Sequence, residues 1–147
     1  MQRNTDSGRF FEATVEQAIR RSCEANNLSA YSQRYIGTTP AGRRHKVDWE
    51  LVHNADPSVR GIVSCKFQMN TGTAEEKVPY EVVKLVHAME NDARYKKAWI
   101  VLGGTGFTPG LKEFFEKKLH EKIPQMKNKV FIIPDTDTLL GTNLSLV

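Results

Sequence analysis

The feature that most constrains the fold is an uninterrupted apolar run at residues 98–102, bounded by Lys97 and Gly103. Half-buried strands alternate between apolar and polar residues, so a short strand without this alternation is typical of a sheet with both faces covered. In α/β proteins, helices provide that cover. The run therefore predicts a central strand lying between two layers of helices.

Three helices are predicted from apolar residues spaced three and four apart. The first spans residues 8–24 after a cap region at residues 5–7, the second runs from Pro79, as a first-turn residue, to about residue 91, and the third begins at Thr108. The residues expected to face inward are Phe11, Val15, Ala18, Ile19, Ser22 and Cys23, then Val82, Leu85, Val86 and Met89, then Leu111, Phe114, Phe115 and Leu119.

Four further strands are predicted at residues 31–36, 46–51, 60–68 and 130–133. In the segment 46–51 the residues alternate between apolar and charged, which indicates one apolar and one acidic face. A polar turn joins this segment to residues 60–68, so the two should form an antiparallel hairpin. The resulting order αβββαβαβ predicts an α/β fold with a mixed β-sheet flanked by helices.

The composition fits one globular domain over residues 1–147 and excludes disorder, collagen and several domains, since 39% of residues are hydrophobic and the formal net charge is +4. A core can form at this length without disulfides, so Cys23 and Cys65 are expected to be reduced. No secretory leader or membrane-spanning run is evident, which favours an intracellular protein of the cytoplasm, the nucleoid or a phage-infected cell. A pI near 9.1 favours a polyanionic partner.

The hairpin is predicted to gather polar side chains. If Asp48 lies opposite Ser64, strand parity places both on one face of the sheet with Lys66 and Gln68. Unpaired charges are costly in a core, so this face is either solvated or its charges are partnered. A carboxylate and a backbone carbonyl suit Mg²⁺, and a nearby lysine can orient or deprotonate a water. This set of groups points to phosphodiester hydrolysis.

These residues resemble the PD-(D/E)XK or restriction-endonuclease-like nuclease superfamily, in which a helix glutamate, a strand aspartate and an acid-x-Lys strand meet at one metal site. Glu12 would match the helix glutamate, Asp48 the aspartate and Lys66 the lysine, over about residues 8–102. Ser64 stands where the acid of acid-x-Lys would be, which makes the motif a Ser-x-Lys variant. The resemblance implies a restriction-endonuclease-like core and a metal-dependent endonuclease.

Within the resemblance, two glutamates are candidates for the missing acid. Some restriction enzymes of the superfamily have Ser-x-Lys and supply the acid from the following helix, where this chain has Glu81, and Glu12 is the alternative. Gln68 stands at a place where the superfamily uses glutamine to bond a phosphate, a water or the first-helix glutamate. The implied catalytic residues are Asp48, Lys66, Glu12, Glu81 and Gln68, and the implied ligands of Mg²⁺, or of Mn²⁺ in its place, are Asp48, Glu81, Glu12 and the Cys65 carbonyl.

Each of these assignments competes with a plainer one. Asp48 would pair with a basic neighbour at the surface, and Glu81, expected in a first helical turn, would interact with the helix dipole. Glu75 and Glu76 are rival carboxylates, at a spacing that also fits a helix cap. The literal Pro-Asp pair ending at Asp135 is a decoy, because no lysine follows it.

Basic and polar loops are candidate contacts to nucleic acid. Arg43, Arg44 and Lys46 are the candidates for contacts to the DNA backbone. The candidates for contacts to the bases are Asn70, Thr71 and Thr73 and the loops at residues 37–44 and 103–110. Together with the resemblance they imply a Mg²⁺-dependent endonuclease on double-stranded DNA, sequence-specific in the manner of restriction or homing enzymes. One site per chain implies a homodimer or larger homo-oligomer, because two strands must be cut.

Other functions stay open at this stage. A structure-specific junction or repair nuclease has the same architecture, and RNA is a further substrate class. A non-catalytic nucleic-acid-binding or assembly module is also possible. Such a module would retain the fold although Ser64 replaces the acidic residue of the motif. The nuclease hypothesis requires the side chains of Asp48 and Lys66 to converge rather than to point to opposite sides of the sheet.

Overall fold

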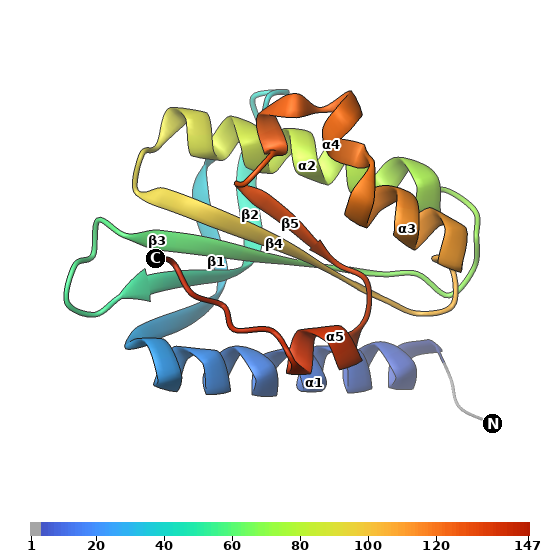
Figure 1. Cartoon of the computed structure of the whole chain (residues 1–147), viewed down its shortest axis with the longest axis horizontal. Coiled ribbons are helices and arrows are strands. Elements are labelled where there is room, and N and C mark those ends of the chain that lie inside the picture. The colour runs from blue at the N-terminus through green and yellow to red at the C-terminus, as the bar shows by residue number, and fades with distance from the viewer. Residues whose placement is uncertain (1–3) are drawn as a thin grey trace.

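A five-stranded sheet runs through the centre of the molecule (Figure 1). The structure, a computed structural model, describes the backbone of residues 4–147 and the side chains from residue 7 onward. Neighbouring strands follow the order β1-β2-β3-β4-β5. Their bounds are β1 Leu28–Thr38, β2 Arg44–His53, β3 Arg60–Phe67, β4 Tyr95–Gly103 and β5 Val130–Ile133.

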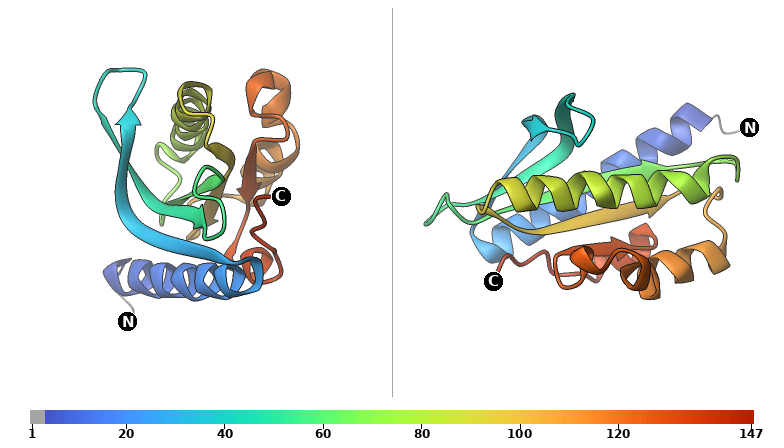
Figure 2. Two further views of the ribbon diagram at one scale, coloured as in Figure 1. Left: turned by 90° about the vertical axis from the view of Figure 1, so that its left-hand side faces the viewer. Right: turned by 90° about the horizontal axis from the view of Figure 1, so that it is seen from above.

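Helices cover both faces of this sheet (Figures 1 and 2). α1 and α5 pack on one face, whereas α2, α3 and α4 pack on the other. The helices are α1 Asn4–Asn26, α2 Ala74–Asn91, α3 Pro109–Lys117, α4 Leu119–Lys122 and α5 Thr136–Leu140, with a 3₁₀ turn at Pro124–Met126. Within residues 4–147, no helix is both long and apolar enough to cross a membrane.

The sheet is mixed, as the order of elements predicts. β1, β2 and β3 are antiparallel neighbours, whereas β3, β4 and β5 run parallel. The predicted hairpin is confirmed as β2 and β3. β4 lies between β3 and β5, and its residues 98–102 are all buried, which confirms the strand expected from the apolar run.

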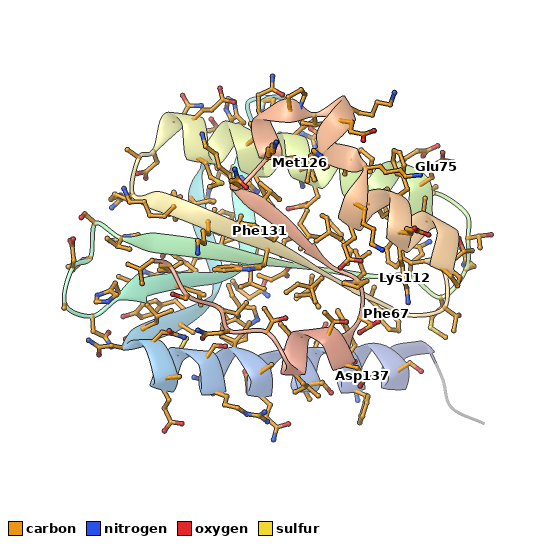
Figure 3. All side chains as sticks on the ribbon, in the orientation of Figure 1. Phe67, Glu75, Lys112, Met126, Phe131 and Asp137 are labelled. Carbon is orange, nitrogen blue, oxygen red and sulfur yellow. The ribbon has the colours of Figure 1, made fainter. Side chains whose placement is uncertain are left out.

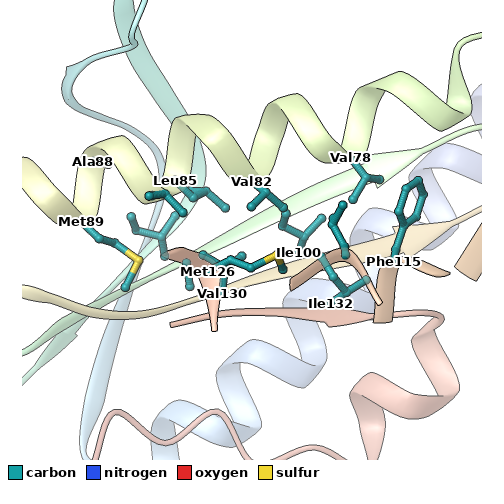
Figure 4. Packing of buried hydrophobic residues seen from close by; sticks show 14 of the residues in the cluster. Val78, Val82, Leu85, Ala88, Met89, Ile100, Phe115, Met126, Val130 and Ile132 are labelled. Carbon is teal, nitrogen blue, oxygen red and sulfur yellow. The ribbon is translucent and has the colours of Figure 1, made fainter. Parts of the chain in front are cut away.

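The face under α2 holds the larger cluster of buried apolar residues (Figure 4). One stripe of α2 points onto β4 and β5 at the spacing of an amphipathic helix. The stripe and its partners are Val78, Val82, Leu85, Met89, Ile100, Val130 and Ile132. Full burial of one such side chain contributes about 1.5–3 kcal/mol, so α2 is a firm support for the polar side chains that it carries.

The opposite face is covered by α1. Its predicted inward stripe is confirmed, because Phe11, Val15, Ala18, Ile19, Ser22 and Cys23 are all buried. The stripe packs on Trp49 of β2 and Val63 of β3. Phe67, labelled in Figure 3 near the end of β3, extends the cluster through its ring, whose centroid lies 5.4 Å from that of Phe11.

Two predicted helix starts are wrong. α1 begins at Asn4, so the expected cap region at residues 5–7 lies inside the helix. α2 begins at Ala74, and Pro79 and Glu81 therefore lie well inside it rather than in its first turn. The reason is burial, because Ala74 and Val78 are fully buried and continue the apolar stripe toward the N-terminus of the helix.

The end of the chain adds elements that the apolar spacing does not predict, namely α4, the 3₁₀ turn and α5. α5 begins after Asp135, whose carboxylate accepts a hydrogen bond from the Thr138 backbone N–H at 2.7 Å. This is an ordinary N-cap. The literal Pro-Asp pair thus has a structural role in starting a helix.

Glu50, expected on the acidic face of β2, is buried. Its carboxylate lies 3.4 Å from Arg34 Nε of β1 and 3.2 Å from Arg60 Nη1 of β3, and it accepts a hydrogen bond from the Tyr95 hydroxyl of β4. Burial, and next the hydrogen bond to Glu50, raise the pKa of Tyr95. The Glu50 carboxylate therefore links its own strand, β2, to β1, β3 and β4.

Replacing Glu50 with alanine should lower the free energy of unfolding by about 1–3 kcal/mol, because the partly buried Arg60 would lose its counter-charge and the buried Tyr95 hydroxyl its acceptor. Urea unfolding followed by circular dichroism measures this change. Glu16→Ala is the matched control, since Glu16 forms an exposed pair with Arg20 at 3.8 Å and such pairs contribute little. Equal effects of the two substitutions would contradict the role given to Glu50.

Candidate active site

β2 and β3 separate at Asp48, and the candidate site lies at this fork. The antiparallel ladder between the two strands ends with the pair Trp49 and Val63. Just beyond this pair, Asp48 Oδ2 accepts a hydrogen bond from the backbone N–H of Cys65, two residues after Val63, at 2.7 Å. The carboxylate thus takes the place of the next ladder partner. After Cys65, the edge of β3 has no further β2 partner among the described residues.

The predicted placement of Asp48 on the same face as Lys66 is wrong. Val47 packs in the α2-side cluster and Trp49 in the α1-side cluster, although strand parity would put both on one face. The face to which the side chains of β2 point therefore changes at Asp48. Gln33, which lies beside Asp48 on β1, has a left-handed φ of 54°. Lys66 keeps to the α2 face, whereas Asp48 lies in the fork itself.

On the α1 side, Asp48 borders a pocket of about 540 Å³, called here the carboxylate pocket. Glu12 of α1 and Cys65 of β3 also line it, so two of the carboxylates expected to share a metal ion face the same space. Burial raises the pKa of the Cys65 thiol, and the negative charges of Asp48 and Glu12 add to this effect. The thiol therefore stays neutral beside the carboxylates.

On the α2 side, Lys66 points to Glu81. Lys66 Nζ lies 3.0 Å from Glu81 Oε1, and Lys84 Nζ lies 3.1 Å from the same oxygen. Glu81 is only 4% exposed. Burial alone would raise its pKa, but the two ammonium groups outweigh burial and hold the pKa of Glu81 below its usual value. The carboxylate is consequently charged at neutral pH.

A second pocket, of about 520 Å³, opens beside this cluster and is called here the lysine pocket. Its lining includes Lys66, Lys77, Tyr80, Glu81 and Lys84. Cys65 and Phe67 line both the lysine pocket and the carboxylate pocket. The two pockets therefore flank the last residues of β3, where the strand edge facing β2 is free.

Gln68 follows β3 and is fixed by both its side chain and its backbone. Its side-chain Oε1 accepts a hydrogen bond from Lys77 Nζ at 2.8 Å, and its Nε2 lies 3.4 Å from Asn70 Oδ1. Its backbone N–H donates to the Gly103 carbonyl at 3.0 Å, and its carbonyl accepts from the Gly106 N–H at 2.7 Å. The glycine-rich loop after β4 thus holds Gln68 in place.

Gly104→Ala should lower the free energy of unfolding by about 2 kcal/mol. The φ of Gly104 is +88°, and an added Cβ would overlap the backbone carbonyl of Gln68. Gly110→Ala is the matched control, because Gly110 is helical and nothing lies within 4 Å of the Cβ that alanine would add. Thermal unfolding compares the variants, and equal melting temperatures would contradict the close approach of the two loops.

Comparison with known protein families agrees with this arrangement of elements. A family model described as a PD-(D/E)XK nuclease superfamily domain matches residues 3–139. The chain belongs to this superfamily. The match includes the resemblance inferred over residues 8–102 and extends through β5, so both the family and the restriction-endonuclease-like core are confirmed. Among curated proteins, no sequence gives a significant match.

In this PD-(D/E)XK domain, the acidic side chains are distributed around the end of β3. Within residues 7–147, no three His, Cys, Asp or Glu side chains form a group that could hold a metal ion. Asp48 and Glu12 share the carboxylate pocket, whereas Glu81 is paired with lysines on the other side. The rival Glu75, labelled in Figure 3, and Glu76 are exposed in the first turn of α2, and Glu76 reaches the lysine pocket.

The DNA contacts expected for the PD-(D/E)XK domain lie on two exposed segments. Figure 2 shows the hairpin of β1 and β2 projecting away from α1, and its tip carries exposed Arg43 and Arg44, followed by Lys46 on β2. The Arg44 guanidinium stacks 3.8 Å from the centroid of the Tyr35 ring. The other candidates, between β3 and α2, are the exposed Asn70, Thr71 and Thr73.

His45, which stands between the candidate DNA contacts Arg44 and Lys46, is buried. Among the described residues, neither of its ring nitrogens has a hydrogen-bond partner. Burial lowers the pKa of His45, Glu81 opposes this effect, and Lys84 reinforces it. Its parity with the buried Val47 is the sequence signal that could have placed it inside.

The stability of the PD-(D/E)XK domain should fall below about pH 6.5 through His45. Because the pKa of His45 is lowered in the folded state, the unfolded chain binds a proton more readily and acidification favours unfolding. In urea titrations between about pH 7 and pH 5, His45→Leu should therefore lose less stability than the wild-type chain. His120→Leu, at a half-buried position on α4, is the control. Parallel pH profiles for wild type and His45→Leu would contradict the prediction.

Proposed function

We propose that the protein is a Mg²⁺-dependent endodeoxyribonuclease that hydrolyses phosphodiester bonds in double-stranded DNA, of sequence-specific restriction or homing type. The observation that best supports this is the fork of β2 and β3. There Asp48 is held by the Cys65 N–H, and Lys66 follows as the next residue on β3. An aspartate and a lysine near the end of β3 agree with the superfamily pattern. Their side chains border different pockets on the two sides of this strand end, so their convergence on one phosphate is itself part of the proposal.

The proposed metal ligands are Asp48, Glu12, Glu81 and the Cys65 carbonyl. All are oxygen donors, which suit Mg²⁺ and Mn²⁺. Mg²⁺ usually binds through one or two carboxylates and keeps several waters, so Asp48 and Glu12, facing one pocket, fit the ion. Glu81, the remaining proposed carboxylate, lies against Lys66 and Lys84 on the α2 side and lines the lysine pocket rather than this one. The ion would supply Lewis-acid stabilisation of phosphate oxygens and a lowered pKa of water.

The chain's own residues have distinct tasks in this proposal. The hydrogen bond from Cys65 fixes Asp48 by one oxygen and orients the other for a ligand. Lys66 keeps a positive charge at the end of β3, where it would offset charge that develops on a phosphate. Gln68 positions the ammonium group of Lys77, and so acts on the phosphate through a lysine.

The substrate contacts and the assembly follow from the same proposal. The exposed basic residues of the β1–β2 hairpin would bind the DNA backbone, whereas the polar loop between β3 and α2 would contact bases. Each chain has one fork, and cleavage of both strands of a duplex needs two sites. We therefore propose a homodimer whose twofold axis matches a twofold target.

The proposal predicts that the purified protein nicks or linearises plasmid DNA with Mg²⁺ or Mn²⁺ and stops when a chelator is added. Asp48→Ala and Lys66→Ala should each lower the cleavage rate about 100-fold or more, because each removes a group acting on the reacting phosphate. Asp56→Ala and Lys96→Ala, at exposed positions away from the fork, should cleave at the wild-type rate. Gel electrophoresis measures the rates, and circular dichroism checks folding.

The outcomes separate the competing functions. Cleavage that survives both Asp48→Ala and Lys66→Ala would reject the proposed site. Wild-type protein that binds DNA without cutting it would favour the non-catalytic module. Faster cleavage of branched DNA than of linear duplex would favour a junction or repair nuclease, and competition by RNA would indicate an RNA-directed enzyme.

A further inference from the structure

The β1–β2 hairpin, which projects away from α1 in Figure 2, carries a half-exposed tyrosine on one face. His45 and Val47 of β2 are buried, so strand alternation places Arg44 and Lys46 on the other, exposed face. Tyr35 of β1 is the ladder partner of Lys46, and the side chains of such a pair point to the same face. Tyr35 therefore lies among basic side chains, and at 52% exposure it belongs to neither apolar cluster.

Arg44 fixes the orientation of the Tyr35 ring. Its guanidinium lies 3.8 Å from the ring centroid, the distance of a planar group stacked on one face of the ring. The ring is consequently held in place while the residue as a whole stays half exposed. An aromatic ring that is oriented but uncovered is suited to stacking with a second flat group on its free side.

The charge around Tyr35 restricts what that flat group can be. The segment 33–47 contains no aspartate or glutamate, and Arg43, Arg44 and Lys46 on it are exposed. Such a surface attracts an anion, and the ring favours an anion that also has a planar aromatic part. A nucleotide combines the two, because its phosphate is joined to a flat base.

This face of the hairpin adjoins the carboxylate pocket. Gln33 of β1 and Asp48 of β2 both line that pocket. Tyr35 follows Gln33 by two residues and Lys46 precedes Asp48 by two, which corresponds to about 7 Å along an extended strand. A DNA strand with one phosphate at the fork would therefore bring its next nucleotides within reach of Tyr35 and Arg44.

An exposed ring selects for unpaired DNA, because the faces of the bases in a duplex are covered by neighbouring bases. We propose that Tyr35 stacks on the base of an unpaired nucleotide in a DNA strand that continues from the fork, while Arg44 and Lys46 bind its phosphates. The inference rests on the proposed function only in taking DNA as the substrate. It adds an unpaired segment, at a strand end or a branch, to the duplex bound at the fork.

The test is binding of fluorescein-labelled DNA to the full chain, measured by fluorescence anisotropy in EDTA so that no cleavage occurs. Wild type should bind a duplex with a single-stranded thymidine tail more tightly than the same duplex with blunt ends. Tyr35→Ala should weaken binding of the tailed duplex about tenfold, as expected for the loss of one stacked base, and should change binding of the blunt duplex by less than about twofold.

Matched variants separate stacking from other roles of the ring. Tyr35→Phe keeps a flat ring and should bind the tailed duplex as wild type does, whereas Tyr35→Leu keeps only apolar bulk and should behave like Tyr35→Ala. Phe10→Ala is the control, because Phe10 is an aromatic residue of α1 that is 72% exposed, and it should leave both affinities unchanged. Circular dichroism checks that every variant is folded, and Tyr35→Leu gives the same readout if alanine impairs folding.

Each contrary result has a distinct meaning. Equal affinity of wild type for the tailed and blunt duplexes would overturn the inference. Equal weakening of both by Tyr35→Ala would also overturn it, because the ring would then only hold the basic side chains in place. Tighter binding of an RNA tail than of a DNA tail would overturn the assignment to DNA. Plasmid cleavage that depends on Asp48, with tail binding that does not depend on Tyr35, would overturn this inference alone, and a wild-type chain that binds no DNA would overturn both proposals.

Discussion

The hydrogen bond from the Cys65 N–H to Asp48 determines where the antiparallel part of the sheet ends. A backbone donor that is shielded from water needs an acceptor, and for this partly buried N–H a side chain supplies it in place of a strand carbonyl. β2 is therefore free to turn away, which places Val47 and Trp49 in different cores. The same turn frees the edge of β3, along which the carboxylate pocket and the lysine pocket are arranged.

Most of the architecture could be predicted because it depends on regular burial. The apolar run at residues 98–102 and the inward stripe of α1 keep the spacing of their elements. Prediction failed where packing overrides a local signal. Pro79 suggested a helix start, but burial of Ala74 and Val78 extends α2 beyond it. Strand parity likewise could not reveal that β2 turns over at Asp48, because that turn depends on a long-range hydrogen bond.

The candidate site could be predicted only in part for a similar reason. The structure brings Asp48 next to Cys65 and places Glu81 against Lys66, whereas the superfamily resemblance implied that Asp48, Glu12 and Glu81 share one metal ion. Lys84 and His45 were not singled out from the sequence. A lysine on a helix and a histidine in a basic run usually face solvent, and here only the packing of α2 on the sheet turns both inward.

The loops that leave β3 and β4 have a consequence for how such a domain can diversify. The two strands are parallel, so their following loops emerge at one edge, where backbone bonds from Gln68 to Gly103 and Gly106 join them. Residues beyond this junction, such as Thr71 and Thr73, are exposed and lie outside the sheet. Insertions or substitutions in these loops would change the surface that they present, while the side chains at the end of β3 would keep their positions.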